Sequence, residues 1–347
     1  MKSRSFGQLP SGEPITAFTL ANAAGTSLEV ITLGGIVTAL RTPDRHGRLA
    51  DVVLGFDRLE PYAAGHPCFG ALIGRVAGRI SAGRLILPDQ TIQLVCTDGP
   101  NHLHGGRIGF DKRIWQAAPV TRPDGADSLR LTYRSPAGEE GYPGNVDVAV
   151  TYTLTAQSEF IVASEAVADR VTPLSLTQHS YFNLAGEGSG SVLDHEVQIL
   201  ADEYVPAADN AMTLSGRRAS VAGTGNDFTG PRRLGDALPG IFRAHGENYL
   251  IRPQAADTPV RVARVVEPAS GRVLEVSTTD CCLQFYTAVA LNGSIVGKSG
   301  RPYVRHAGLC LECHGYPDGA HRPDLGAILM SPGQPQRRTT VYAFSHL

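Results

Sequence analysis

The chain has 347 residues, of which 42% are hydrophobic and 18% are charged, and its formal net charge at pH 7 is −2. This apolar content supplies a sizeable core and excludes an intrinsically disordered chain. Lysines and arginines are scattered, and no apolar run reaches the length of a membrane span, so we expect neither nucleic acid nor a membrane as partner.

Short β-type runs broken by Gly, Pro, Asn and Asp dominate the whole chain, and no helical periodicity long enough for a core helix separates them. The predicted strands are 15–20, 28–33, 36–40, 52–56, 129–133, 146–154, 160–167, 174–184, 192–199, 260–266, 273–277, 283–289 and 339–344. Strands without intervening helices pair antiparallel, and so many of them predict an all-β fold, a large sandwich or barrel.

The least strand-like segment is 201–243, which is rich in Gly, Pro, Asp and Arg. We interpret it as a long loop, because strands of the same character resume after it, and we expect residues 1–347 to form a single domain. Six cysteines behind a polar N-terminus predict reduced thiols and a cytoplasmic location. The chain is expected to act as a monomer or homodimer.

The first cluster of candidate site residues is 74–80, which carries two arginines. If this segment is a strand, alternation places Arg75, Ala77 and Arg79 on one face, where inward arginines need an anion or several hydrogen-bond acceptors. The structural alternative is a solvated arginine face.

Two further clusters contain histidines. Residues 98–106 hold His102 and His104 in a turn-rich segment, and loop histidines on a β scaffold are good site candidates. Without a third ligand at a useful spacing, this pair predicts no metal site. The polar run 177–186, which includes His179, interrupts a strand-like segment and therefore indicates function, although a satisfied buried histidine is the alternative.

The fourth cluster is Glu312, a carboxylate within the apolar strand-like segment 308–313. Burial would raise its pKa toward the range of a general base, whereas pairing with an arginine would make it structural. Cys310 and Cys313 form a CxxC, but residues three apart in a strand face opposite sides, so we predict no metal there.

Together these clusters resemble the aldose 1-epimerase family, in the family's order along nearly the whole chain. Residues 74–80 are similar to its GRVANRI, and 100–106 to its N-x-L-H-G-G. The remaining matches are 141–145 with G-[YF]-P-G-N, 178–186 with the histidine strand, 284–287 with Q-x-Y-T, and 308–312 with the run carrying the catalytic glutamate. The resemblance implies a large antiparallel β-supersandwich of the galactose mutarotase type, which binds a sugar on a concave sheet surface.

The resemblance also implies the reaction, which interconverts the α and β anomers of a free monosaccharide without a cofactor or metal. The family's general base falls on Glu312 and its general acid on His179. The implied substrate-binding residues are Arg79, His104, Gln284, Tyr181 and Glu247.

Three positions depart from the family pattern. Gly78 stands where the family has Asn, Gly246 where it has Asp, and His314 where it prefers Gln. Glu247, next to Gly246, is a candidate replacement for the missing carboxylate, although neighbours in a strand point to opposite sides. These departures leave arabinose, xylose and fucose as alternatives to galactose or glucose.

Two other functions fit the same fold. One is a catalytically silent sugar-binding or sensor protein, which the retention of Glu312 and His179 argues against. The other is a glycoside hydrolase, which normally needs two carboxylates around the scissile bond. Glu165 and Glu196 are the other strand carboxylates considered, and neither has supporting sequence context.

Overall fold

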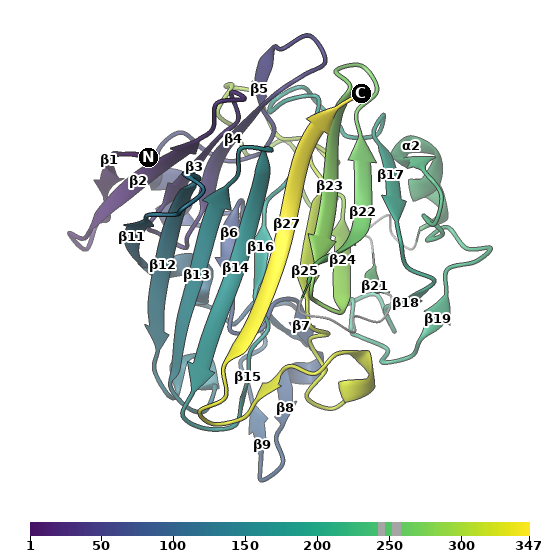
Figure 1. The fold of residues 1–347 in the computed structure, drawn as a ribbon. Coiled ribbons are helices and arrows are strands. Elements are labelled where there is room, and N and C mark those ends of the chain that lie inside the picture. Colours follow the sequence, from purple (N-terminus) through teal and green to yellow (C-terminus); the bar gives the residue numbers. More distant parts are fainter. Residues whose placement is uncertain (242–246, 252–257) are drawn as a thin grey trace.

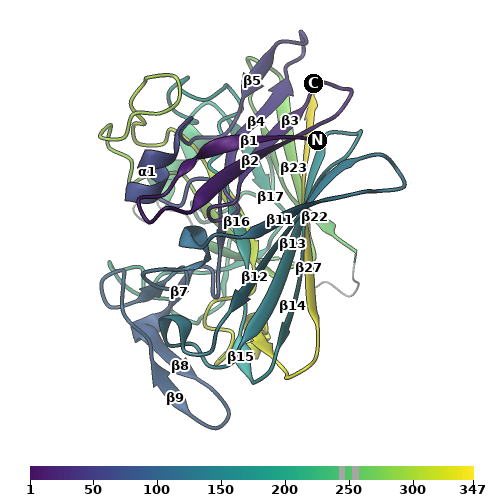
Figure 2. The same ribbon diagram turned by 90° about the vertical axis from the view of Figure 1, so that its left-hand side faces the viewer.

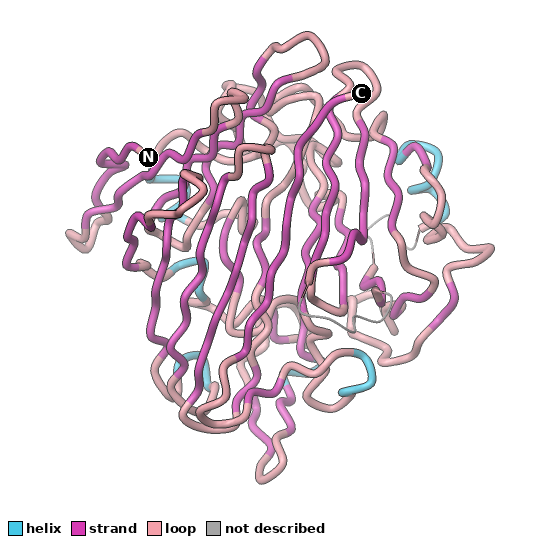
Figure 3. Tube along the Cα trace, in the orientation of Figure 1, coloured by secondary structure: helices cyan, strands magenta, loops and turns pink. Residues whose placement is uncertain are grey.

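The computed structural model describes residues 1–241, 247–251 and 258–347, and it consists mainly of strands (Figure 3). Its helices are short: α1 (Leu59–Ala64), α2 (Leu234–Ala237), η1 (Ser81–Gly83), η2 (Phe110–Lys112), η3 (Glu139–Gly141), η4 (Leu238–Gly240) and η6 (Pro323–Leu325). Within the described ranges, no helix has the length and apolar character needed to cross a membrane.

The largest sheet has nine antiparallel strands and spans the front of the molecule in Figure 1. Its order is β11 (Gln116–Val120), β12 (Asp127–Ser135), β13 (Val146–Leu154), β14 (Glu159–Ala168), β27 (Gln336–His346), β23 (Arg272–Thr278), β22 (Val260–Val266), β17 (Glu196–Ile199) and β20 (Arg232–Arg233). The last strand of the chain, β27, pairs with β14 on one side and β23 on the other, and so joins the two halves of the sheet.

A second layer lies behind this sheet, which Figure 2 shows nearly edge-on. Its strands are β19 (Ala219–Ser220), β18 (Glu203–Val205), β21 (Asn248–Leu250), β24 (Cys282–Tyr286) and β25 (Cys310–His314), followed by the pair β16 (Thr177–His179) and β6 (Ala71–Ile73). Phe182 and Leu309 exchange backbone hydrogen bonds of 2.7 and 2.9 Å, which hold β16 beside β25.

Smaller sheets complete the fold. The N-terminal sheet contains β1 (Lys2–Gln8), β2 (Pro14–Ala21), β3 (Ser27–Ile31), β4 (Val37–Pro43) and β5 (Leu49–Asp51). The two-stranded pairs are β7 (Arg79–Ile80) with β10 (His102–Leu103), β8 (Arg84–Ile86) with β9 (Thr91–Gln93), and β15 (Thr172–Pro173) with β26 (Leu329–Met330).

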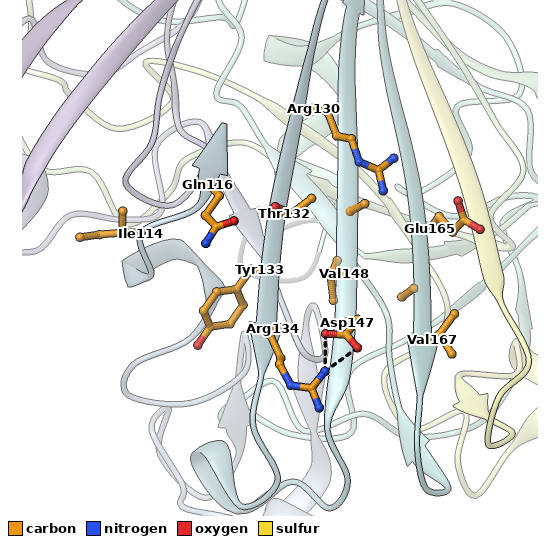
Figure 4. A pocket seen from close by; sticks show the side chains of 12 residues that line it. Ile114, Gln116, Arg130, Thr132, Tyr133, Arg134, Asp147, Val148, Glu165 and Val167 are labelled. Atoms are coloured by element: carbon orange, nitrogen blue, oxygen red, sulfur yellow. Dashed lines mark hydrogen bonds and ion pairs between the residues drawn. The ribbon is translucent and has the colours of Figure 1, made fainter. Parts of the chain in front are cut away.

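The main core lies between the two layers, and strand alternation decides which side chains enter it. In β12, Leu129 and Leu131 join the core, whereas Arg130 is exposed on the opposite face. That outer face carries mainly polar side chains and ion pairs, such as Arg134 with Asp147 at 2.7 Å (Figure 4).

The same alternation in β25 determines where chemistry takes place. Leu311 and Cys313 point into the main core, where the hydroxyl of Tyr342 donates a 3.1 Å hydrogen bond to the Leu311 carbonyl. Residues at the alternate positions, including Glu312, therefore point away from the large sheet. The two cysteines of the CxxC thus lie on opposite sides of the strand, as expected: Cys310 belongs to a separate apolar cluster.

Most predicted strands are confirmed, but four sequence interpretations need correction. Residues 52–56 and 174–184 were expected to be full strands, yet only β16 within 177–179 is one. These segments pair briefly with each other through a bridge between Val53 and Phe182. The segment 201–243 is not simply a loop, because its described part contains β18, β19, β20 and α2. Within 74–80, only Arg79–Ile80 is a strand, because Gly78 turns the backbone with a φ of +76°.

Candidate active site

A cavity of about 340 Å³ opens on the face of β24 and β25 that points away from the large sheet. It is lined by Pro67, Cys68, Gly78, Arg79, Asp98, Leu103, His104, His179, Tyr181, Leu214, Asn248, Gln284, Tyr286, Ala290 and Glu312. Six of the seven residues that the sequence analysis selected therefore meet in one cavity. They come from segments more than 200 residues apart, brought together by the second layer and the β7–β10 pair.

Glu312 and His179 form the centre of this cavity. Oε2 of Glu312 lies 3.5 Å from Nε2 of His179, and their side chains are only 3% and 5% exposed. Among the described residues, neither Oε2 of Glu312 nor Nδ1 of His179 has a hydrogen-bond partner. The His179 ring stacks on Tyr181 at 5.1 Å between centroids, which fixes the plane of the imidazole.

Burial opposes charge on both members of this pair. It raises the pKa of Glu312 to about 8, with the Arg79 guanidinium acting in the opposite direction. Burial, helped by neighbouring His314, lowers the pKa of His179 to about 4. Between these two values the pair holds one proton, which belongs to the pair rather than to either residue.

The hydrogen bonds of His104 define its tautomer. Its Nδ1 accepts a 3.1 Å hydrogen bond from the backbone N–H of Gly78, and the backbone N–H of His104 donates to the Gly78 carbonyl at 3.0 Å. Burial, His179 and Arg79 lower the pKa of His104, which favours the neutral ring. A neutral ring that accepts at Nδ1 carries its proton on Nε2, so His104 offers a hydrogen-bond donor to a ligand.

The side chains of the two arginines in residues 74–80 point to different parts of the molecule, so the expectation that they share a face is wrong. Arg79 lines the cavity, and its Nε donates a 2.6 Å hydrogen bond to Oδ2 of Asp98. Arg75 is 2% exposed and extends elsewhere, toward the backbone of residues 135–143. The backbone turn at Gly78 separates them.

The side chains of His102 and His104 also lie in different surroundings. His102 is completely buried, bonded through Nε2 to the hydroxyl of Tyr142 at 2.7 Å and through Nδ1 to the carbonyl of Val95 at 2.8 Å. Both of its ring nitrogens are therefore satisfied by the protein, which is the arrangement of a structural histidine.

Glu247 lies apart from the cavity that holds the other six candidates. It is 4% exposed, burial raises its pKa to about 7, and it lines a different hollow with Tyr204 and Asn226. Gly246, the proposed position of the missing carboxylate, lies outside the described residues. Instead, the neighbour of Glu247 in β21, Asn248, faces the site beside Gln284, its partner in the β21–β24 register.

The donor atoms of His104, His179 and Glu312 lie within 4.8 Å of one another, and imidazole nitrogens with a carboxylate oxygen are ligands used by zinc. Tetrahedral zinc with bonds of about 2.1 Å holds its ligands roughly 3.4 Å apart. The group supplies three donor atoms among the described residues, whereas a closed structural zinc site has four protein ligands.

Comparison with known proteins identifies the family. The sequence profile described as aldose 1-epimerase matches residues 16–343. The galactose mutarotases of Mus musculus and Homo sapiens are each 42% identical over 340 residues, covering 98% of this chain and 97% of the relative. The chain belongs to the aldose 1-epimerase family.

More distant family members agree in sequence and structure. The aldose 1-epimerase of Escherichia coli is 34% identical over 341 residues, covering 96% of both chains. The aldose epimerase homologue from C. elegans has a TM-score of 0.87 at 27% identity and covers 95% of this chain and 99% of its own. A galactose 1-epimerase from Lactobacillus acidophilus has a TM-score of 0.84 at 26% identity, covering 100% and 99%. The predicted galactose mutarotase fold is confirmed.

Two of the departures from the aldose 1-epimerase pattern adjoin each other in space. A Cβ atom added to Gly78 would lie 2.6 Å from Cγ of Pro317 and 3.7 Å from Cε1 of His314. His314 is fully buried and its Nδ1 pairs with the Gly315 carbonyl at 2.8 Å. The ring of Pro317 and that of His314 therefore occupy the space beside Gly78, which lines the cavity with backbone alone.

Sequence reasoning did not select Asp98, Asn248, Tyr286, Leu214 or Cys68, all of which line the cavity. Asn248 was the one most open to detection, because it follows Glu247 by one residue and alternation places it on the opposite side. Asp98 lies in the turn-rich segment 98–106, but only the β7–β10 pairing brings it to Arg79.

Proposed function

We propose that this protein is an aldose 1-epimerase in which Glu312 is the general base and His179 the general acid. The observation that carries the proposal is the buried pair itself, with 3.5 Å between Oε2 and Nε2, facing a cavity of about 340 Å³. A cavity of this size is at the small end of ligand pockets and suits a monosaccharide. The names of the relatives support galactose as the first sugar to test.

The proposed reaction opens and closes the sugar ring. Glu312 takes the proton of the anomeric hydroxyl while His179 delivers a proton to the ring oxygen, and the ring opens to the free aldehyde. Rotation about the bond between C1 and C2 then presents the other face of the aldehyde. The same residues in reversed roles close the ring to the opposite anomer, so protons and electrons balance without a cofactor.

The other cavity residues supply binding groups in this proposal. His104 offers Nε2–H and Arg79 its guanidinium as donors to sugar oxygens, which stabilise charge on the ring oxygen during opening. Gln284 and Tyr181 line the same space, and Gln284 pairs with Glu312 across the β24–β25 register. Glu247 is not included, because it lines a different hollow.

We further propose that residues 1–347 act as one domain, as a monomer or homodimer in the cytoplasm. The main core draws residues from Leu20 to Phe344, which supports one folding unit. All six cysteines are free, which is typical of a reducing compartment.

Polarimetry tests the proposal. Freshly dissolved α-anomers of galactose, glucose, arabinose, xylose and fucose are followed to equilibrium with the wild-type protein, Glu312→Gln and His179→Asn. We expect the wild type to accelerate relaxation, and each variant to lose roughly 10²–10⁴-fold in rate. The matched control is Glu165→Gln, which removes one carboxylate from the outer face of the large sheet (Figure 4). There Glu165 pairs with Arg337 at 2.6 Å.

The control should keep full activity, and the fastest sugar identifies the preferred substrate. Binding of a sugar in calorimetry without any acceleration of relaxation would refute the catalytic proposal. It would establish the silent sugar-binding protein instead.

A further inference from the structure

Asp98 adds a second carboxylate to the cavity, beside the arginine that faces the sugar. Its Oδ2 accepts a 2.6 Å hydrogen bond from Nε of Arg79, and the two side chains are 37% and 19% exposed. Both residues line the same cavity as Glu312. Arg79 donates to the described residues through Nε alone. Its two Nη groups therefore stay available to a ligand.

The backbone around Asp98 is well anchored. Asp98 and Asn101 exchange backbone hydrogen bonds of 3.0 Å across a tight turn. The Asn101 side chain is fully buried and donates to the Ala211 carbonyl at 3.1 Å. Asp98 is therefore held at a fixed place relative to His104, which follows the same turn, instead of moving with a free loop.

Near neutral pH the Glu312–His179 pair holds one proton and is neutral as a whole, so the charges that line the cavity cancel. Among the described residues that line the cavity, Arg79 is the one cation, and Asp98 and Glu312 are the two carboxylates. The lowered pKa of His104 keeps its imidazole neutral, so the pair and His104 add no net positive charge. Without Asp98, the positive charge of Arg79 would face the ligand uncompensated.

We propose that Asp98 is a specificity-determining residue that restricts the site to uncharged aldoses. Its carboxylate neutralises Arg79, so the guanidinium binds hydroxyl oxygens but does not attract a sugar that carries a carboxylate or phosphate. Like charges brought together in a binding site are an effective means of excluding the wrong partner. This inference rests on the proposed function, because it concerns substrate choice in the same cavity.

The adjacent Asp98 and Arg79 groups also match the chemistry of a hydroxyl. A hydroxyl donates one hydrogen bond and accepts others, and here a carboxylate acceptor lies next to a guanidinium donor. Gly78 contributes no side chain to the neighbouring wall of the cavity. Because residue 78 is glycine and has no side chain to contact a ligand, Asp98 supplies the polar group at this wall of the cavity.

The test compares galactose with galacturonate, which differs in having a carboxylate at C6. Asp98→Asn keeps the shape of the side chain and an oxygen that accepts from Arg79, but removes the negative charge. Galactose is measured as substrate, and galacturonate as substrate and as competitive inhibitor. We expect the variant to bind galacturonate about tenfold more tightly relative to galactose, an effect that added salt reduces.

Asp147→Asn is the matched control, since it makes the same change of charge on the outer face of the large sheet (Figure 4). It should leave the preference unchanged. A preference that shifts less than twofold in Asp98→Asn, or shifts equally in both variants, overturns the inference. Wild-type protein that fails to accelerate galactose relaxation refutes the proposed function itself, and the two failures are therefore distinguishable.

Discussion

Replacing each arginine of residues 74–80 by lysine should damage different properties of the protein. Arg75 is buried, and its guanidinium donates five hydrogen bonds of 2.8–3.3 Å to three backbone carbonyls and two hydroxyls. Arg79 donates one hydrogen bond, to Asp98, and faces the cavity. We predict that Arg75→Lys lowers stability and Arg79→Lys lowers activity.

The magnitudes follow from these contacts. Lysine presents its donors at a single point and does not reach all the acceptors that the planar guanidinium of Arg75 reaches. Leaving at least two buried acceptors unpaired should lower the free energy of unfolding by roughly 2–5 kcal/mol. The partly exposed pair of Arg79 and Asp98 contributes about 0–1 kcal/mol, so stability should barely change in Arg79→Lys. Its lost charged hydrogen bonds to substrate should reduce kcat/KM about 10–100-fold.

Both properties can be measured on the same preparations. Urea unfolding is followed by the fluorescence of Trp115, the only tryptophan of the chain, which is buried in the main core. Activity is measured by polarimetric relaxation in the absence of urea, at a temperature where both variants are folded. An unchanged unfolding midpoint in Arg75→Lys, or a loss of stability in Arg79→Lys as large as that in Arg75→Lys, would contradict the assignment of roles.

Two further predictions concern protonation and a buried ion pair. Because the pKa of Glu312 is raised to about 8 and that of His179 lowered to about 4, the pair carries the one proton it needs between these limits. Above the upper limit no proton remains for the ring oxygen, and below the lower limit no base remains, so kcat/KM against pH should be bell-shaped. A rate that rises steadily past pH 9 would exclude this scheme. The Lys298 ammonium bonds Asp51 at 2.8 Å and two carbonyls at 2.7 and 2.9 Å, and all three hydrogen bonds are partly buried. Lys298→Met should therefore lower the free energy of unfolding by roughly 2–4 kcal/mol in urea titrations while KM stays unchanged; an unaltered midpoint would show that the pair contributes nothing.

The strand pattern was readable from the sequence because alternation and turn residues are local properties. The expected strand 146–154 coincides with β13, and the expected strand 260–266 with β22. The family motifs likewise identified six residues that the structure gathers in one cavity. Local pattern failed over most of 52–56 and 174–184, where only 177–179 forms a strand and the other pairings are isolated bridges, because burial between sheets does not require a regular strand.

The sequence by itself determined the all-β class, the family and the identities of the acid–base candidates, since each depends on short-range pattern or motif. Only the tertiary structure separated Arg75 from Arg79 and placed Glu247 in another hollow. It alone also brought Asp98 to the cavity, through pairing of β7 with β10. The physical reason is that a side chain's environment depends on partners distant in sequence, which hydrogen-bond register and backbone turns bring together and which no local pattern records.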